Sequence, residues 1–402
     1  MRRILFVDDE PNVLDGLRRM LRPMRHEWEM VFVSGGTEAL AALSSRQFDV
    51  VVSDMRMPGI NGAQLLAEVM SMQPRAVRII LSGHSDQELI LKSAGLAHQY
   101  LAKPCDSEEI KRIVARACAL RELLEDEPLK RLITQMKSLP SLPSLYTELL
   151  EELNTLDSSI RKIGSIISRD VAMTAKALQM VNSAFFGIRR QIASPTEAVS
   201  LLGLETVMKL TLLIQVFTQF DRTLLPNFSP DALISHSLRV GLFAKRIAHA
   251  EGAESSVVSD AFTGGLLHDV GRLVMVANLP WEYALMQELV TAEHLSREAA
   301  ERQVFGATHT EVGAYLLGLW GLPKSIIEAV AFHHQPRQSM AGGFGPITAV
   351  HIGNVVEHEI QASPGAHGRA ALDLDYLAEL GLESRVPVWR DLCVQIAAAE
   401  TA

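Results

Sequence analysis

Apolar residues along the first 120 positions alternate between short continuous runs and longer stretches with helical spacing. The short runs predict buried strands at Ile4–Val7, Met30–Val33, Val50–Val52, Val77–Leu81 and Tyr100–Ala102. The stretches 12–22, 36–46, 62–72 and 86–95 repeat apolar residues every three or four positions, as does a fifth from Ser107. Strands that are apolar on both faces and alternate with helices predict a doubly wound, five-stranded parallel α/β domain.

The remainder of the chain has a helical pattern. Helical spacing continues through residues 121–137, with an interruption at Pro128, and then breaks at the two prolines of SLPSLPSL (138–145). From there to about Phe332 the spacing is helical, without convincing strand alternation, and helical segments follow to residue 402. We therefore predict a multidomain chain with an α/β domain at 1–120, a helical connector at 121–137, an all-α domain at 138–360 and a helical tail at 361–402.

Composition excludes several classes of protein. Of the 402 residues, 48% are apolar, which excludes wholesale disorder and a collagen-like chain. The formal net charge of −9 argues against nonspecific binding to nucleic acid or to an anionic membrane. Cys105, Cys118 and Cys393 form no CxxC pair, as expected for thiols of a reducing compartment. No segment approaches the ~20 uninterrupted apolar residues of a membrane span, so we expect a soluble, cytoplasmic protein.

Polar residues follow the predicted strands of the first domain. Asp8 and Asp9 follow the first strand, and Asp54 follows the third. Ser82 ends the fourth strand, and Lys103 with Pro104 follows the fifth. Because the carboxyl ends of parallel strands meet at one edge, these groups are expected to converge there. Three carboxylates in one crevice favour a hard divalent cation, with Mg²⁺ the leading candidate, and a carboxylate beside it can attack phosphorus.

Each of these residues also has a purely structural interpretation. Asp8 or Asp9 alone could cap the following helix, and Asp54 could form the turn before Pro58. Lys103 alone could be a solvated surface residue. Their joint order, each at its own strand end, favours a functional site.

The segments VDDEP, VVSDMRMPGING, IILSGHSD and YLAKP resemble the receiver domain of bacterial two-component response regulators. This resemblance implies that Asp54 accepts phosphate from a histidine kinase, and that Asp8, Asp9, Asp54 and the backbone carbonyl of Arg56 hold Mg²⁺. It also implies that Ser82 is the switch hydroxyl, Tyr100 the switch aromatic residue, and Lys103 the phosphate-pairing lysine before a cis Pro104.

Histidines recur on the apolar faces of four predicted helices in the second domain. They are His236, His268, His309 and the pair His333-His334, and Asp269 directly follows His268. A mixed histidine and aspartate shell inside a helical bundle suits Fe, Mn or Zn, which could activate water for phosphoester hydrolysis. The alternative interpretation of each one is a core histidine paired with a backbone carbonyl.

GGLLHDVGRL resembles the motif of the HD superfamily of metal-dependent phosphohydrolases, and the wider pattern over about 138–360 resembles its HDOD branch. The related HD-GYP phosphodiesterases, which cleave cyclic di-GMP, carry a GYP signature that is missing after His334. Asn354 stands where active HD enzymes have a final aspartate ligand, and Arg272 where active HD-GYP proteins usually have lysine. HDOD domains are generally non-catalytic signalling modules, so the resemblance implies a vestigial metal site.

Three functions are consistent with these features. The leading hypothesis is a signalling switch in which phosphorylation of Asp54 changes a protein-binding surface of the HDOD domain. The same hypothesis allows the chain to form a homodimer on phosphorylation. The second is a response-regulated phosphohydrolase acting on a cyclic dinucleotide or nucleotide. The third, a DNA-binding regulator, is disfavoured by the acidic charge and by the lack of a recognisable helix-turn-helix motif.

Charge is distributed unevenly between the two halves. Residues 1–120 contain 15 acidic and 15 basic residues, so the remainder, with 47 − 15 = 32 acidic and 38 − 15 = 23 basic residues, carries the whole −9. The acidity therefore belongs to the helical half, where a basic partner surface would meet it.

Overall fold

The computed structural model describes residues 1–83, 96–103, 107–120, 127–136, 140–141, 143–153, 155, 159–182, 190–204, 207, 218–219, 228–339, 342–361 and 371–401. The predicted helix at 86–95 and the predicted cis Pro104 lie outside these residues. Among the helices that are described, none combines the length and the apolar character needed to cross a lipid bilayer.

The first domain is a parallel sheet of five strands in the order β2-β1-β3-β4-β5. The strands are β1 (Arg2–Val7), β2 (Trp28–Val33), β3 (Val50–Asp54), β4 (Val77–Ser82) and β5 (Gln99–Ala102). The helical elements are α1 (Pro11–Leu21), the 3₁₀ turn η1 (Arg22–His26), α2 (Gly36–Ser45), α3 (Gly62–Met72) and α5 (Ser107–Leu120). The doubly wound five-stranded sheet predicted from the apolar runs is confirmed.

Burial on both faces explains why the strands are almost continuously apolar. Ile4 and Phe6 of β1 pack into one buried cluster, whereas Leu5 and Val7 pack into a second cluster on the opposite face. Successive side chains of a strand point to opposite faces, so a strand covered on both sides needs apolar residues at every position.

The second domain is helical. Its elements are α7 (Pro143–Leu153), α8 (Ile160–Ile167), α9 (Val171–Val181), α10 (Pro195–Leu202), α12 (Pro230–Ala250), α13 (Ser255–Leu267), α14 (Val270–Asn278), α15 (Pro280–Ala292), α16 (Arg297–Phe305), α17 (His309–Leu319), α18 (Lys324–Phe332), η4 (Pro336–Gln338) and α19 (Pro346–Gln361).

The helical domain also contains one short pair of strands. The strands β6 (Pro140–Ser141) and β7 (Thr218–Gln219) pair in parallel, in a region whose sequence shows helical spacing without convincing strand alternation. Two residues are too few to produce the alternation of apolar and polar positions by which a strand is recognised in a sequence.

The carboxyl-terminal segment comprises α20 (Leu374–Glu379), η5 (Glu383–Arg385) and α21 (Val386–Thr401), and it packs onto the helical domain. The Trp389 side chain is completely buried beside residues of α12 and α19. Its indole nitrogen donates to Glu251 Oε1 at 2.8 Å, and Arg385 donates to the same oxygen. This segment is therefore part of the core around α12 and α19.

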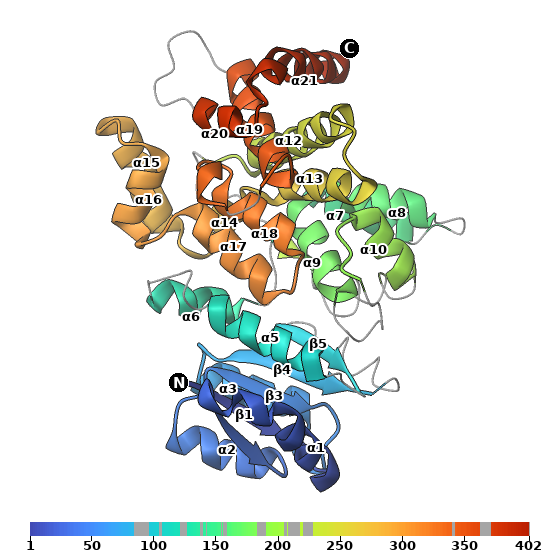
Figure 1. The fold of residues 1–402 in the computed structure, drawn as a ribbon, viewed down its shortest axis with the longest axis vertical. Coiled ribbons are helices and arrows are strands. Elements are labelled where there is room, and N and C mark those ends of the chain that lie inside the picture. Colours follow the sequence, from blue (N-terminus) through green and yellow to red (C-terminus); the bar gives the residue numbers. More distant parts are fainter. Residues whose placement is uncertain are drawn as a thin grey trace.

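The two domains are connected through α5 and α6 (Glu127–Gln135), which lie between the sheet and the helical bundle in Figure 1. One buried apolar cluster runs from Ile4 and Phe6 through Val114 and Ile133 to Leu316 of α17. Because the core continues across the connection, the domains pack as neighbours with a shared apolar contact.

Lys176 is an unusual buried charge near this connection. Its side chain lies on α9, whose residues are all buried, and its Nζ is 5.0 Å from the centre of the Trp320 ring. Burial lowers the pKa of Lys176 to about 7. A cation over an aromatic face recovers only part of the cost of desolvating an ammonium group.

Lys176→Met is therefore expected to flatten the dependence of stability on pH. Between pH 7 and 10 the unfolded lysine remains protonated while the folded one is neutral, so the unfolded state binds more protons and wild-type stability rises with pH. Thermal unfolding at pH 7 and pH 9.5 measures this rise. The exposed Lys324→Met is the control and should keep the wild-type slope; an equal slope in Lys176→Met would contradict the assignment.

Candidate functional site

Acidic and basic groups meet at the carboxyl ends of β1, β3 and β5. Lys103 Nζ lies 2.7 Å from Asp8 Oδ2 and also pairs with Asp54 Oδ1. The Asp8 side chain is fully buried and that of Asp54 is nearly so. Asp9, the residue after Asp8, is half-buried. The sequence analysis expected these groups to converge, and the structure brings Asp8, Asp54 and Lys103 together.

The geometry also tests whether Asp8 or Asp9 caps the following helix and whether Asp54 forms a turn. Glu10, not Asp8 or Asp9, is the N-cap residue of α1, and no side chain caps that helix. Asp8 Oδ1 instead accepts from the backbone N–H of Glu10 at 3.0 Å. Asp54 Oδ2 accepts from the N–H of Arg56 at 2.8 Å, so Asp54 forms the expected turn while its other oxygen faces Lys103.

The electrostatics of this site favour a charged lysine. Burial raises the pKa of Asp54 even though Lys103 opposes the shift. Burial alone would lower the pKa of Lys103, but its hydrogen bonds to Asp54 and Asp8 raise it. The ammonium group therefore stays charged and partly neutralises the two buried carboxylates.

Ser82 and Tyr100 lie on the two strands beside the aspartates. The Ser82 hydroxyl is fully buried and has no hydrogen-bond partner among the described residues. Tyr100 is 2% exposed and packs in the apolar cluster that also contains Met55. A buried hydroxyl without a partner costs stability, which is a common sign of a site that binds a further group.

Gly62 fixes the backbone beneath Asp54. A Cβ atom at Gly62 would lie 2.2 Å from the carbonyl oxygen of Asp54, so only glycine allows α3 to start this close to β3. The side chain of Asn61 and that of Gln64 form a capping box at the start of α3. These local features position the loop that follows Asp54.

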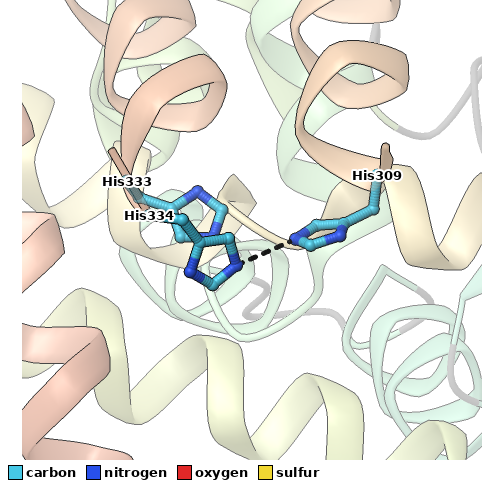
Figure 2. A group of neighbouring side chains, drawn as sticks. All are labelled: His309, His333 and His334. Atoms are coloured by element: carbon cyan, nitrogen blue, oxygen red, sulfur yellow. Dashed lines mark hydrogen bonds between the residues drawn. The ribbon is translucent and has the colours of Figure 1, made fainter. Parts of the chain in front are cut away.

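A second cluster gathers the predicted histidines in the helical bundle. His236 lies on α12, His268 ends α13, and His309 begins α17, where a Thr308–Glu311 capping box fixes the start of the helix. His333 and His334 follow α18. Figure 2 shows His309, His333 and His334 facing one another, with His334 Nε2 3.3 Å from His309 Nε2.

Asp269 joins the cluster from the residue before α14. Its Oδ1 lies 3.3 Å from His309 Nε2, and its Oδ2 accepts a hydrogen bond from Arg272. Burial would raise the pKa of Asp269, but Arg272 and the surrounding histidines hold it well below its usual range. The carboxylate is therefore charged and paired with an internal guanidinium.

Most of these histidines have their second ring nitrogen fixed by a neighbour. His268 Nδ1 contacts the Gly265 carbonyl at 2.7 Å, and His333 Nδ1 contacts that of Val330 at 3.0 Å. Pairing with a backbone carbonyl, the alternative interpretation, is thus observed for one nitrogen of His268 and one of His333. The other nitrogen of His268 lies 3.2 Å from His236 Nε2, and His333 Nε2 is buried without a hydrogen-bond partner among the described residues.

Several partners of this cluster are absent from the sequence prediction. Glu301 Oε2 lies 2.7 Å from His309 Nδ1, and Glu357 Oε2 lies 2.5 Å from His236 Nδ1. Arg239 also donates to Glu357.

Asn354, which the sequence analysis did name, is buried on α19, and its Oδ1 lacks a hydrogen-bond partner among the described residues. The signal for Glu357 was its position three residues after Asn354, on the same face of a helix.

Burial and charge divide the histidines into two kinds. Burial lowers the pKa of His268 to about 3 and that of His333 well below its usual value, so both rings are neutral. Burial would also lower the pKa of His309, but the Glu301 carboxylate raises it. Neutral imidazoles are the form that binds metal ions.

Ligand atoms lie close enough to hold a metal ion in three sets among the described residues. Within each set all of the ligand atoms lie within 4.8 Å of one another. The sets are His309 with His333 and His334, His236 with Glu357 and His358, and His236 with His268 and Asp269. Imidazole donors fit Fe, Mn or Zn, whereas the Arg272 guanidinium competes for Asp269.

Glycines allow the helices of this cluster to approach closely. A Cβ atom at Gly271 of α14 would lie 1.9 Å from the carbonyl oxygen of His309 on α17. A Cβ atom at Gly265 of α13 would lie 2.7 Å from the Cα of Gly241 on α12. The GGLLHDVG segment therefore encodes close helix crossings as well as side-chain chemistry.

Comparison with protein families supplies the decisive observation. Residues 4–115 match the model described as "Response regulator receiver domain", and residues 139–336 match the "HDOD domain". The chain is a response regulator with an HDOD domain. The helices that carry His236, His268, His309 and His333 thus lie in the HDOD domain, and Asp54 lies in the receiver domain.

Two curated proteins are similar to parts of this chain. An uncharacterized protein of Treponema pallidum is 28% identical over 200 residues, 50% of this chain and 38% of that protein. The hydrogenase transcriptional regulatory protein HoxA of Cupriavidus necator is 36% identical over 125 residues, 31% of this chain and 25% of its own. The chain thus spans a quarter to two fifths of the length of these curated relatives.

A solved structure resembles a larger part of the response regulator. The crystal structure of the MmoQ response regulator from Methylococcus capsulatus is 26% identical, with a TM-score of 0.49, and it covers 60% of this chain and 98% of its own. The signal receiver domain of an HD domain-containing protein from Pseudomonas fluorescens is 32% identical, with a TM-score of 0.29, and covers 30% of this chain and 97% of its own.

Proposed function

We propose that this response regulator accepts a phosphoryl group on Asp54 from a histidine kinase and that its HDOD domain binds protein partners without catalysing a reaction. The observation that carries the first part is the pairing of the buried Asp8 and Asp54 with Lys103, beside a Ser82 hydroxyl that has no hydrogen-bond partner among the described residues. The proposal places the receiver domain at 1–120, the connector at 121–137, the HDOD domain at 138–360 and a helical tail at 361–402. A cytoplasmic location and dimerisation on phosphorylation belong to the same proposal.

The same proposal gives the receiver domain a magnesium ion. Asp8, Asp9 and Asp54 would supply carboxylate oxygens, and the Arg56 carbonyl lies two residues after Asp54, a donor set that suits a hard cation. In the present structure Lys103 pairs with Asp8 and Asp54, and among the described residues the three carboxylates are not one of the sets that already lie close enough to hold an ion. When bound, Mg²⁺ would neutralise negative charge on the phosphoryl oxygens and the carboxylates. In the part of the chain that the structure describes, the Ser82 hydroxyl has no hydrogen-bond partner, which supports phosphorylation of Asp54 because a phosphoryl oxygen there would accept a hydrogen bond from it.

The chain's own residues account for the transfer in chemical terms. An Asp54 carboxylate oxygen attacks the phosphorus of a phosphohistidine, the new P–O bond forms, and the P–N bond to the kinase breaks. Lys103 would then pair with a phosphoryl oxygen in place of its contact with the Asp54 carboxylate. The Ser82 hydroxyl would donate a hydrogen bond to another phosphoryl oxygen.

The HDOD cluster supports binding rather than hydrolysis because its charges are already paired within the protein. Asp269 pairs with Arg272, Glu301 with His309, and Glu357 with His236 and Arg239. A permanent guanidinium beside the cluster's aspartate opposes the approach of a divalent cation. The acidic surface of this half favours a protein partner with a basic surface.

The experiment that tests phosphorylation uses the full chain with Mg²⁺ and acetyl phosphate as a small phosphodonor. Mass spectrometry is expected to find one base-labile phosphoryl group on the wild type and none on Asp54→Asn. Asp15→Asn, an exposed aspartate of α1 paired with Arg18, is the control and should be labelled normally. Equal labelling of Asp54→Asn would remove Asp54 from the proposal.

A phosphohydrolase is the second candidate. It is favoured by the set of His309, His333 and His334, and by His333 Nε2, for which the described residues supply no hydrogen-bond partner. A cavity of about 170 Å³ also opens beside His334, lined in part by Glu298, Arg302 and Thr310. Metal analysis of the purified protein, with hydrolysis assays on cyclic di-GMP, distinguishes the candidates. Stoichiometric Fe, Mn or Zn with turnover that His268→Ala abolishes would overturn the non-catalytic proposal.

A further inference from the structure

The amino-terminal ends of β4 and β5 hold the connector helix α6. The Arg78 guanidinium donates to the Thr134 carbonyl at 2.7 Å, and His98 Nε2 lies 2.9 Å from the same oxygen. Arg78 also donates to the Leu96 carbonyl at 2.6 Å. Two side chains of the receiver domain therefore bind one carbonyl near the end of the connector.

The same strand ends also contact the HDOD domain directly. Gln99 Nε2 donates to the Leu319 carbonyl at the end of α17 at 3.1 Å. In the opposite direction, Gln179 Nε2 of α9 donates to the His98 carbonyl at 3.3 Å. Together with Arg78 and Thr134, these residues form a polar contact between the domains, which we call the strand-end contact.

The strand-end contact buries basic side chains. Arg78 is fully buried, His98 is 2% exposed, and Lys176 of α9 is 3% exposed. The positive charge of Arg78 and of Lys176 disfavours protonation of His98, in addition to the effect of burial on its pKa. Burying cations is costly, and much of that cost is regained when the surfaces separate. Returning these groups to water would therefore offset part of the cost of exposing the apolar contact that the two domains share.

The paired strands β4 and β5 link this contact to the phosphorylation site. Their register runs from Ile79 opposite Gln99 to Ser82 opposite Ala102. Gln99 therefore lies at one end of the pair, and Ser82 with Lys103 lies at the other. Binding of Ser82 and Lys103 to a phosphoryl group on Asp54 would move the carboxyl ends of both strands.

We propose that the strand-end contact is a latch that keeps the HDOD domain docked on the unphosphorylated receiver domain, and that a phosphoryl group on Asp54 releases it. This inference rests on the proposed phosphorylation of Asp54. Lys103 pairs with the free Asp54 carboxylate in the docked arrangement, so the structure corresponds to the latched state. Release exposes the surfaces of α6, α9 and α17 that the receiver domain covers.

A distance measurement on the full chain tests the latch. Spin labels are placed on Ser45→Cys in the receiver domain and Ser256→Cys in the HDOD domain, both exposed, with Cys105 replaced by alanine. Cys118 and Cys393 are buried and stay in place. Pulsed electron resonance then reports the distance with and without Mg²⁺ and beryllium fluoride, which imitates a phosphoryl group on aspartate.

The latch predicts that beryllium fluoride raises the undocked population about tenfold in the wild type and leaves Asp54→Asn unchanged. Arg78→Ala is expected to undock without beryllium fluoride, also in the Asp54→Asn background. Gln99→Ala removes only the hydrogen bond to the Leu319 carbonyl and should give a smaller shift in the same direction. This milder variant keeps the test decisive if Arg78→Ala does not fold. The control Arg46→Ala, which removes an exposed receiver arginine paired with Glu29, should behave as the wild type.

Two failures can be told apart. An unchanged distance in a chain that acetyl phosphate labels on Asp54 would overturn the latch and leave the proposed phosphorylation intact. A chain that acetyl phosphate does not label would overturn both. Undocking by Arg46→Ala to the same extent as by Arg78→Ala would also overturn the latch, because the effect would then not depend on the strand-end contact.

Discussion

Lys103→Met is expected to destabilise the receiver domain at neutral pH by about 3 kcal/mol, because it leaves two buried carboxylates without their cation. Burial already raises the pKa of Asp54, and without Lys103 to oppose that shift it would rise further in the folded state. The folded variant would bind more protons than the unfolded chain, so the loss of stability should shrink as the pH falls from 7 toward 5. Millimolar Mg²⁺ should also restore stability, since it replaces the missing positive charge.

Hydrogen exchange of the β1 and β3 amides measures this effect in the receiver domain alone. Lys111→Met is the matched control, because Lys111 pairs with the exposed Glu108 in the same domain, and its loss is expected to cost less than about 1 kcal/mol. If Mg²⁺ stabilised Lys103→Met no more than it stabilises the wild type, the assignment of this acidic site as a cation site would be wrong.

Gly271→Ala is expected to produce the largest loss in the HDOD domain, about 3 kcal/mol or more, because its Cβ would overlap the backbone of His309. The helices α14 and α17 would have to separate, which would move His309 away from Asp269. Thermal unfolding measures the loss, and hydrogen exchange of α17 locates it.

Gly345→Ala provides the comparison, since a Cβ atom at Gly345 would meet nothing within 4 Å. Its effect on stability is expected to stay within about 0.5 kcal/mol of zero. Equal melting temperatures for the two variants would show that the close crossing of α14 and α17 is not required for stability.

The sequence predicted the fold well, and it also predicted that Asp8, Asp54 and Lys103 meet at one edge of the sheet, because both depend on local patterns. The five strands are marked by short apolar runs; Asp8 and Lys103 each follow a strand and Asp54 ends one, and the parallel sheet brings these strand ends together. The histidines of the HDOD domain were equally visible, because each sits on or directly beside the apolar face of a helix.

The partners of these groups were not predictable in the same way. Glu357 reaches His236 across 121 positions, and no spacing rule connects α12 to α19. Arg78 did give a signal, because a charged residue inside an otherwise apolar buried strand needs a specific partner. That partner, the Thr134 carbonyl, lies in a different element and could be identified only from the packing of α6 against the sheet.

The state of Asp54 is expected to determine which proteins the HDOD domain binds. Quantitative affinity capture tests it most directly, with the full chain used in three forms: wild type with Mg²⁺ and beryllium fluoride, wild type alone, and Asp54→Asn with both reagents. We predict at least one partner whose recovery differs about tenfold between the first form and the other two. Identical partners in identical amounts across all three forms would contradict the claim.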